Sequence, residues 1–332
     1  MIGKLKHWWA NRWVRLFVKT SVTLVLLFFL FQQITWEDFW PILKAADGYW
    51  VAAAIFISLG RNFLAAWRLQ VLLLGKTFRV SYWALLKGYY YGFFFNFFLP
   101  TAIGGDVVRT YVLRAYTISL KERAGAIVVE RILGFLALTL MPLLLMPFCL
   151  PVFHQFPYLW TLVAIDAVIL LSLLFILFGG VSRSITLFRL SPRGIIGKVV
   201  EYVKVFEGYT KNNTSLFRAL FLSLLYQFFG IMNVYCLGVA LGQELNVIFY
   251  ILIMPSVWLL SMIPISLNGF GLRETGFVSL FKQVGVPTTV GLGVSAFFVI
   301  LLVLQALIGG VWLLVSPDKI RSGKLDSETP EM

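Results

Sequence analysis

Six stretches of the chain are apolar over lengths that suit membrane-crossing helices. A helix needs about 20 residues to cross a hydrocarbon core of roughly 30 Å. Stretches of that kind occur near residues 16–34, 49–74, 122–147, 158–180, 216–241 and 288–315. Only helices and closed barrels satisfy their backbone hydrogen bonds in lipid, and these lengths are helical. The sequence therefore predicts an all-α, polytopic membrane protein.

The charge of the chain fits a membrane better than a nucleic acid. Only 13% of the 332 residues are charged, yet the net charge is +13. The basic residues flank apolar spans, so orientation and anionic lipid headgroups explain them. The two cysteines and two histidines show no ligand spacing. We therefore expect no metal, no cofactor, no disulfide framework and no nucleic-acid partner.

Two further apolar segments, 81–99 and 246–267, decide the topology. With the basic N-terminus inside, eight full spans would leave the basic residues of 109–123 and 183–211 outside, against the positive-inside rule. If the two segments instead open helical hairpins that enter and leave by one face, every basic loop falls inside. We favour six full spans plus two re-entrant hairpins. Eight ordinary spans with an unusual charge distribution are the alternative.

This topology gives the chain two similar halves that start from opposite faces. Each half contains span, span, hairpin and span, and inverted repeats with broken helices are typical of transporters. The predicted parts are a cytoplasmic or interfacial N-terminus (1–15), a first membrane repeat that begins with an uncleaved helix (16–147, hairpin near 81–121), an extracytoplasmic loop (148–157), a second membrane repeat (158–315, with a basic cytoplasmic stretch at 181–215 and a hairpin near 246–285) and a cytoplasmic tail (316–332).

The two predicted hairpins break in the same way. In NFFLPTAIGGDVVR the break contains Asn96 and Pro100, and in IPISLNGFGLRE it contains Pro264. In both, an arginine follows the proline by nine residues. Glycines permit a turn, and the free N–H groups of a helix start, with an arginine one turn in, favour a phosphate or carboxylate. The predicted binding residues at the breaks are Gly104, Gly105 and Arg109, and Asn268, Gly269, Gly271 and Arg273.

Acidic residues near the breaks are expected to hold the arginines when the site is empty. Asp106 can also cap the helix that begins near it. For Glu130, in KERAGAIVVERILGF, we expect a pair with Arg109, Arg273 or Arg61, either structural or with a role in substrate or proton binding. The predicted ion-pair residues are Asp106, Glu130, Arg131 and Glu274.

Other ionisable residues within spans also need an explanation, because each costs about 2.5 to 3.5 kcal/mol to insert. Arg61 and Arg68 are seven residues apart on one helical face. We expect Arg61, the deeper one, to line a substrate cavity, and Arg68 to reach water at the cytoplasmic boundary. Asp166 is a lone intramembrane acid, for which we expect a buried partner.

At several of these motifs the sequence resembles the flippase-like transmembrane family found as the membrane portion of bacterial lysylphosphatidylglycerol synthases. The matching passages are RNFLAAWRLQVLL, NFFLPTAIGGDVVRTYVLR, KERAGAIVVERILGF and IPISLNGFGLRETGF. The resemblance implies lipid translocation without lipid synthesis, because only a short tail follows the last span where such synthases continue into an aminoacyl-transfer domain.

We therefore expect a flippase of the inner or cytoplasmic membrane, with both termini cytoplasmic. It would move an anionic phospholipid or polyprenyl-phosphate lipid between leaflets by alternating access, without acting as an enzyme. One alternative is an accessory subunit of a lipid-modifying or glycosyl-transfer pathway. Another is a lipid-headgroup enzyme that uses Asp106 and Glu130 as general acid and base.

Overall fold

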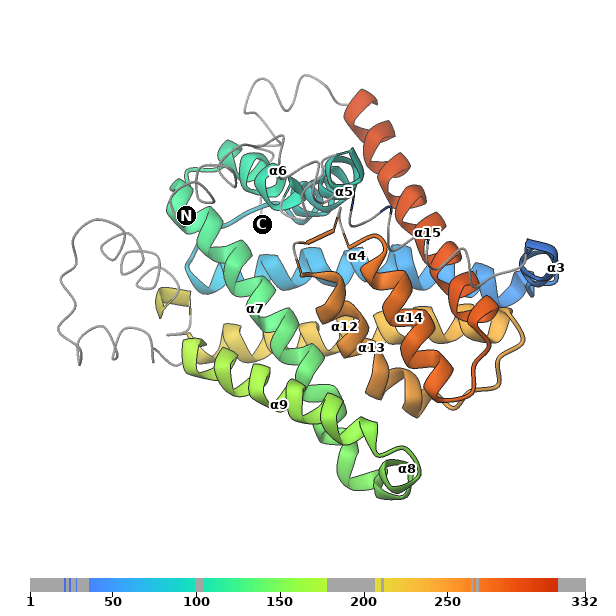
Figure 1. Cartoon of the computed structure of the whole chain (residues 1–332). Coiled ribbons are helices and arrows are strands. Elements are labelled where there is room, and N and C mark those ends of the chain that lie inside the picture. The colour runs from blue at the N-terminus through green and yellow to red at the C-terminus, as the bar shows by residue number, and fades with distance from the viewer. Residues whose placement is uncertain are drawn as a thin grey trace, which may run out of the picture. The chain divides into compact units, whose positions relative to one another are not determined.

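The structure is a computed structural model that describes residues 21, 24, 28, 36–98, 104–177, 207–209, 212–263, 265–266 and 269–315 (Figure 1). Every regular element in these ranges is a helix, so the all-α prediction is confirmed. Several predictions fall outside the described residues: segments 1–15 and 316–332, most of 16–34 and of 181–215, and the break residues Pro100, Pro264 and Asn268.

Five of the described helices are long and apolar enough to cross a membrane. They coincide with five of the six expected full spans, so the chain is a multi-pass membrane protein. These helices are α4 (Gly48–Gly75), α7 (Leu120–Leu145), α9 (Tyr158–Leu177), α12 (Asn213–Ala240) and α15 (Thr288–Val315). The shorter elements are α3 (Trp36–Lys44), α5 (Tyr82–Phe98), α6 (Gly104–Val112), η1 (Leu113–Ala115), η2 (Met146–Phe148), α8 (Leu150–Gln155), α13 (Val247–Ser261) and α14 (Leu272–Gln283).

Helices α5 and α6 form a helical hairpin. A Cβ added to Gly92 of α5 would lie 3.4 Å from the carbonyl oxygen of Gly105, at the start of α6. One added to Gly88 would lie 3.6 Å from Val112, at the end of α6. The order of these contacts shows that α6 returns antiparallel to α5, and the two glycines allow the close approach.

The boundaries of this hairpin differ slightly from those expected. Asn96 lies inside α5, which continues to Phe98, so Asn96 does not mark the break. The returning helix begins at Gly104, two residues before the expected start near Asp106, so Asp106 lies within its first turn.

Helices α13 and α14 form a second helical hairpin. Tyr250 in the first turn of α13 contacts Phe281 near the end of α14, with ring centroids 5.4 Å apart. Val257, further along α13, would lie 3.3 Å from a Cβ added to Gly276 of α14. These two contacts again show antiparallel packing.

The chain divides into two compact units, each of which holds most or all of one hairpin. Unit 1 comprises Met1–Phe56, Phe95–Gly104 and Ile231–Leu304, and unit 2 comprises Ile57–Phe94, Gly105–Gly230 and Gln305–Met332. Each unit contains residues from both of the sequential halves expected from the sequence. Compactness does not measure internal symmetry, so the inverted repeat stays a prediction.

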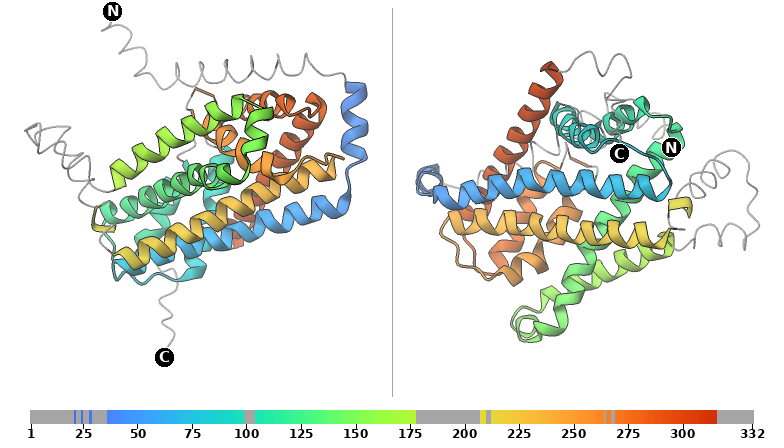
Figure 2. Two further views of the ribbon diagram at one scale, coloured as in Figure 1. Left: turned by 90° about the horizontal axis from the view of Figure 1, so that it is seen from below. Right: turned by 180° about the vertical axis from the view of Figure 1, so that it is seen from behind.

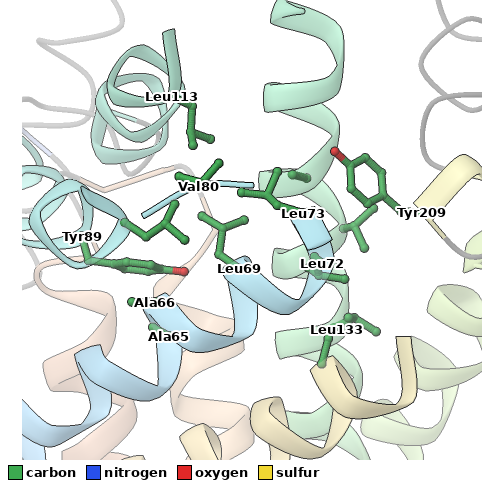
Figure 3. Close-up of a cluster of buried hydrophobic side chains, with 14 of the residues drawn as sticks. Ala65, Ala66, Leu69, Leu72, Leu73, Val80, Tyr89, Leu113, Leu133 and Tyr209 are labelled. Atoms are coloured by element: carbon green, nitrogen blue, oxygen red, sulfur yellow. The ribbon is translucent and has the colours of Figure 1, made fainter. Parts of the chain in front are cut away.

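The apolar core of unit 2 joins α4, α5, α7 and α9. Leu69, Leu72 and Leu73 of α4 lie close to Leu133 of α7 and Tyr89 of α5 (Figure 3). Helix α9 packs along α7, as the two views of Figure 2 also show. This core fixes the helices that carry the polar residues described below.

Small residues bring two helices of unit 2 into backbone contact. A Cβ added to Gly309 of α15 would lie 2.7 Å from the carbonyl carbon of Tyr90 on α5. The ring of Tyr90 also packs edge-on against Trp312, one turn further along α15, at 5.2 Å. Such contacts stabilise helix pairs in lipid, where apolar burial offers little.

Aromatic rings form the core of unit 1. Tyr250 contacts Tyr235 of α12 as well as Phe281, and Phe281 stacks edge-on with Phe277. Phe277 and Phe281 are one turn apart on the buried face of α14. This face holds the second hairpin together.

Candidate functional site

The carboxylate of Glu130 is the centre of a buried polar cluster in unit 2. Glu130 lies on α7 and is 1% exposed. Ser119 caps the start of this helix by accepting a hydrogen bond from the N–H of Glu122. One turn beyond Glu130, a Cβ added to Gly134 would lie 3.5 Å from Nη1 of Arg68, so the glycine leaves room for an arginine.

Arg68 of α4 pairs with Oε1 of Glu130. Its Nη2 contacts this oxygen, and its Nε donates to the same atom at 3.2 Å. Its Nη1 donates to Oγ of Ser223 on α12 at 3.2 Å. Arg68 is 6% exposed, so the prediction that it reaches water at the membrane boundary is wrong. A buried counter-ion stabilises its charge where water does not reach it.

Arg109 of α6 pairs with the other oxygen of Glu130. Its Nη2 contacts Oε2 of Glu130 and donates to the hydroxyl of Tyr89 at 2.7 Å. The guanidinium also lies over the Tyr89 ring, 3.9 Å from its centroid, and the Tyr89 hydroxyl donates to Glu130. Glu130 thus pairs with Arg109, one of the three partners expected for it.

Asp106 connects the start of α6 to α7. Its Oδ1 lies 3.4 Å from Nη1 of Arg109, and its Oδ2 lies 2.5 Å from Nε of Arg131. The carboxylate therefore contacts two arginines. Asp106 lies within the first turn of α6, whereas a capping residue would precede the helix, so it is not the predicted cap. Arg131 and Glu130 are adjacent on α7, so the two acidic residues and their arginines form one continuous network.

Arg61 joins this network through an aromatic ring. Its Nε donates to the backbone oxygen of Tyr226 at 3.2 Å, and its guanidinium lies 4.2 Å from the centroid of the Tyr226 ring. Arg68 lies 5.0 Å from the same centroid. We call these charged residues, together with Tyr89, Ser223 and Tyr226, the arginine cluster. Its charged members are Arg61, Arg68, Arg109, Arg131, Asp106 and Glu130.

The arginine cluster contains more positive than negative charge. Three guanidinium groups, those of Arg68, Arg109 and Arg131, contact the two carboxylates, and the fourth, that of Arg61, lies beside them on the ring of Tyr226. Arginine stays charged even when buried and binds carboxylates and phosphates with two parallel hydrogen bonds. Chemically, the cluster suits an oxyanion.

Arg273 and Glu274, two of the residues predicted for the second hairpin, form a cluster in unit 1. Arg273 is 4% exposed and donates to Oε1 of Glu274 from Nε at 3.1 Å and from Nη2 at 2.6 Å. Ser295 of α15 donates to the same oxygen at 3.0 Å. The guanidinium also faces the rings of Phe270 and Phe298, at 5.0 and 5.3 Å.

Glu274 also caps the start of α14. Its Oε2 accepts a hydrogen bond from the N–H of Gly271 at 2.6 Å. Gly269 and Gly271 have φ angles of +79° and +84°, which glycine adopts without strain. One of the N–H groups expected to face an anion is therefore already bound by Glu274.

Several members of the arginine cluster were not predicted from the sequence. Tyr89, Ser223 and Tyr226 lie in aromatic or apolar runs that give no separate signal. The heptad spacing of Arg61 and Arg68 was the available clue to Arg68. For Asp166 the expected buried partner is not found: within the described part of the chain, neither carboxylate oxygen has a hydrogen-bond partner.

A further ion pair, between Lys76 and Glu122, lies at the end of α4, outside the arginine cluster. Nζ of Lys76 lies 2.9 Å from Oε2 of Glu122 and 4.4 Å from the ring centroid of Tyr209. Burial, followed by the charge of Glu122, raises the pKa of the Tyr209 hydroxyl. This hydroxyl donates to the backbone oxygen of Glu122 at 3.0 Å, which requires the neutral form.

Comparison with known protein families identifies the family of the chain. Residues 16–310 match the family model described as the lysylphosphatidylglycerol synthase TM region. The chain belongs to this family. The match covers both hairpins, four of the five long described helices completely and α15 as far as residue 310, so the lysylphosphatidylglycerol synthase TM region accounts for nearly the whole sequence. No curated protein matches the chain.

Membership of the lysylphosphatidylglycerol synthase TM family limits the range of functions. The family implies a membrane protein related to lipid modification or lipid transport. The resemblance noted in the sequence is thereby confirmed.

Proposed function

We propose that the protein is a flippase that moves a lipid with an anionic phosphate headgroup between leaflets by alternating access. The observation that carries this proposal is the arginine cluster, in which Arg68, Arg109 and Arg131 contact two buried or half-buried carboxylates on helices of a membrane protein. Several guanidinium groups in a region of low dielectric constant favour an anion over a neutral or cationic ligand.

The lipid phosphate binds at the start of α6, with Arg109 as its main cationic contact. Gly104 and Gly105 supply backbone N–H groups at that end of the helix. When the phosphate arrives, Arg109 exchanges the carboxylate of Glu130 for it, and Arg68 retains Glu130. Arg273 plays the corresponding part at the start of α14, where Glu274 is its partner in the empty state.

The membrane topology that we propose has six full spans and two re-entrant hairpins, related as an inverted repeat. The hairpin geometry of α5–α6 and of α13–α14 supports it, because both pairs fold back on themselves. Helix length also supports it, because α13, with 15 residues, is short for a full crossing and α5, with 17, is at the lower limit. We place the protein in the inner or cytoplasmic membrane with both termini cytoplasmic.

A leaflet-exchange assay with purified protein in liposomes tests this function. The panel contains labelled phosphatidylglycerol, a polyprenyl phosphate and, as a zwitterionic reference, phosphatidylcholine. The variants are Arg109→Ala and Arg273→Ala, with Lys76→Ala as a control that removes a half-buried ion pair outside the arginine cluster.

We expect faster exchange of one anionic lipid class, at least about tenfold slower exchange in the two arginine variants, and no change in Lys76→Ala. Exchange that is equal for all lipids, or unchanged in both folded arginine variants, overturns the site assignment. No exchange of any lipid by folded protein overturns the flippase proposal and favours an accessory role beside a lipid-modifying enzyme.

A further inference from the structure

Asp166 occupies a core position of a membrane-spanning helix. Leu159, Val163 and Asp166 follow one stripe of α9, and all three are buried, Asp166 completely. Ile165 and Val168, on other faces, are 49% and 65% exposed. Helix α9 packs along α7 (Figures 1 and 2), so the stripe faces protein. Asp166 lies about 12 Å along the helix from Tyr158, near the middle of the span.

No charged or hydrogen-bonding group in the described part of the chain compensates the Asp166 carboxyl. Both of its oxygens are buried without a hydrogen-bond partner, and no described lysine or arginine pairs with it. The hydroxyl of Thr139, a buried residue of α7, donates instead to oxygens of its own helix at Phe135 and Leu136.

The charged groups on the neighbouring elements are engaged elsewhere or exposed. On α7, residues 132–145 contain no charge, and Glu130 and Arg131 belong to the arginine cluster. Lys121, Glu122 and Arg123 lie at the opposite end of α7 from the α8 turn. His154 of α8 and Arg218 of α12 are exposed. The rest of α9 is uncharged.

We propose that Asp166 is a proton-binding site of the transport cycle, with the proton bound in this conformation and released when α7 and α9 admit water. An ionised carboxylate without a partner is strongly disfavoured in an apolar interior, whereas the protonated group is neutral. A metal cation would need several oxygen ligands, and Asp166 offers two. A proton needs one, so the site suits a proton.

The packing of α9 on α7 connects this site to the arginine cluster. Helix α7 carries both Glu130 and the surface against which Asp166 is buried. A displacement of α7 that accompanies exchange of partners at Glu130 would also change the surroundings of Asp166. The coupling of proton release to lipid movement rests on the proposed flippase function, but the protonation of Asp166 does not.

Carbodiimide labelling tests the protonation directly. Dicyclohexylcarbodiimide reacts with protonated carboxyl groups in apolar surroundings, and peptide mass spectrometry locates the product. We expect labelling of Asp166 in the intact protein at neutral pH, falling about tenfold per pH unit once the group ionises. Glu130, ion-paired with Arg68 and Arg109, serves as an internal control that should not react. Absence of label on Asp166 even at acidic pH overturns the proposal.

Liposomes with an imposed pH gradient test the coupling. In the native protein, we expect the gradient to change the ratio of inward to outward lipid transfer at least about tenfold. In Asp166→Asn, which stays neutral, exchange should persist without a response to the gradient. A gradient response retained by Asp166→Asn overturns the coupling. Should no lipid move at all while Asp166 is still labelled, the flippase proposal fails and the proton site stands.

Discussion

Arg68 and Arg109 bind opposite oxygens of one carboxylate, Oε1 and Oε2 of Glu130. The two arginines come from different helices, α4 and α6, and Tyr89 of α5 adds a third donor to the same group. Glu130 therefore compensates two buried charges at once. Each of the four helices in this contact contributes one side chain that the others need.

Glu130→Gln should destabilise the protein strongly. The amide keeps the size of the side chain but leaves both arginines buried without their shared counter-charge, and breaking a buried pair in this way costs about 3 to 5 kcal/mol. Thermal unfolding in detergent measures the loss. The matched control is Glu122→Gln, whose pair with Lys76 is more exposed and should contribute less than about 1 kcal/mol. Equal losses in the two variants would contradict the central role of Glu130.

Gly309→Ala should disrupt the packing of α15 on α5. The added methyl group would meet the backbone of Tyr90, which cannot move as a side chain can, and we expect a loss of about 2 kcal/mol or more. Gly60→Ala is the control, because nothing lies within 4 Å of that position and alanine favours the helix. Thermal stability and elution as a single species distinguish the two. A stable, monodisperse Gly309→Ala protein would rule out this backbone contact.

Gly269→Ala should cost more than Gly285→Ala. Both glycines have positive φ angles, +79° and +84°, so both substitutions add backbone strain of about 1 to 3 kcal/mol. Only at Gly269 does the new Cβ also meet an atom, the carbonyl oxygen of Ser261 at 2.6 Å. The difference between the two unfolding free energies therefore reports the tight turn between α13 and α14. The reverse order would be incompatible with this turn.

Single cysteines at Phe148 and Asn213 should label from opposite sides of the membrane. Both positions are exposed, and the native Cys149 and Cys236 are buried. In the proposed topology Phe148→Cys reacts with an impermeant maleimide in intact cells, and Asn213→Cys reacts only after permeabilisation. Eight full spans would reverse this result. Gln283→Cys is outside in both topologies and calibrates the labelling.

The helices could be predicted from the sequence because membrane spans depend on length and apolar composition alone. The two hairpins could be anticipated because the basic loops allow few topologies. Their boundaries could not, since Asn96 is compatible with both a helix and a break, and packing against neighbouring helices decides between them.

The site was predictable only in part, for a similar physical reason. Arg109, Asp106 and Glu130 stand out as charges within apolar sequence. Arg68 does too, but its position near the end of a span suggested contact with water, whereas α7 and α12 cover it. Tyr89 carries no such signal, since its role depends on the hydroxyl at the end of an otherwise apolar side chain.

The shared carboxylate of Glu130 also limits how the protein can change shape. If α6 moves away from α7, Arg109 keeps Asp106, which lies on the same helix, but loses Glu130, and in this buried site no water replaces that carboxylate. Intermediate positions of α6 are therefore high in energy. In the proposed transport cycle, the network would therefore make the movement of α6 a two-state switch, in which a ligand acts by stabilising the second state and not by pulling the helix gradually.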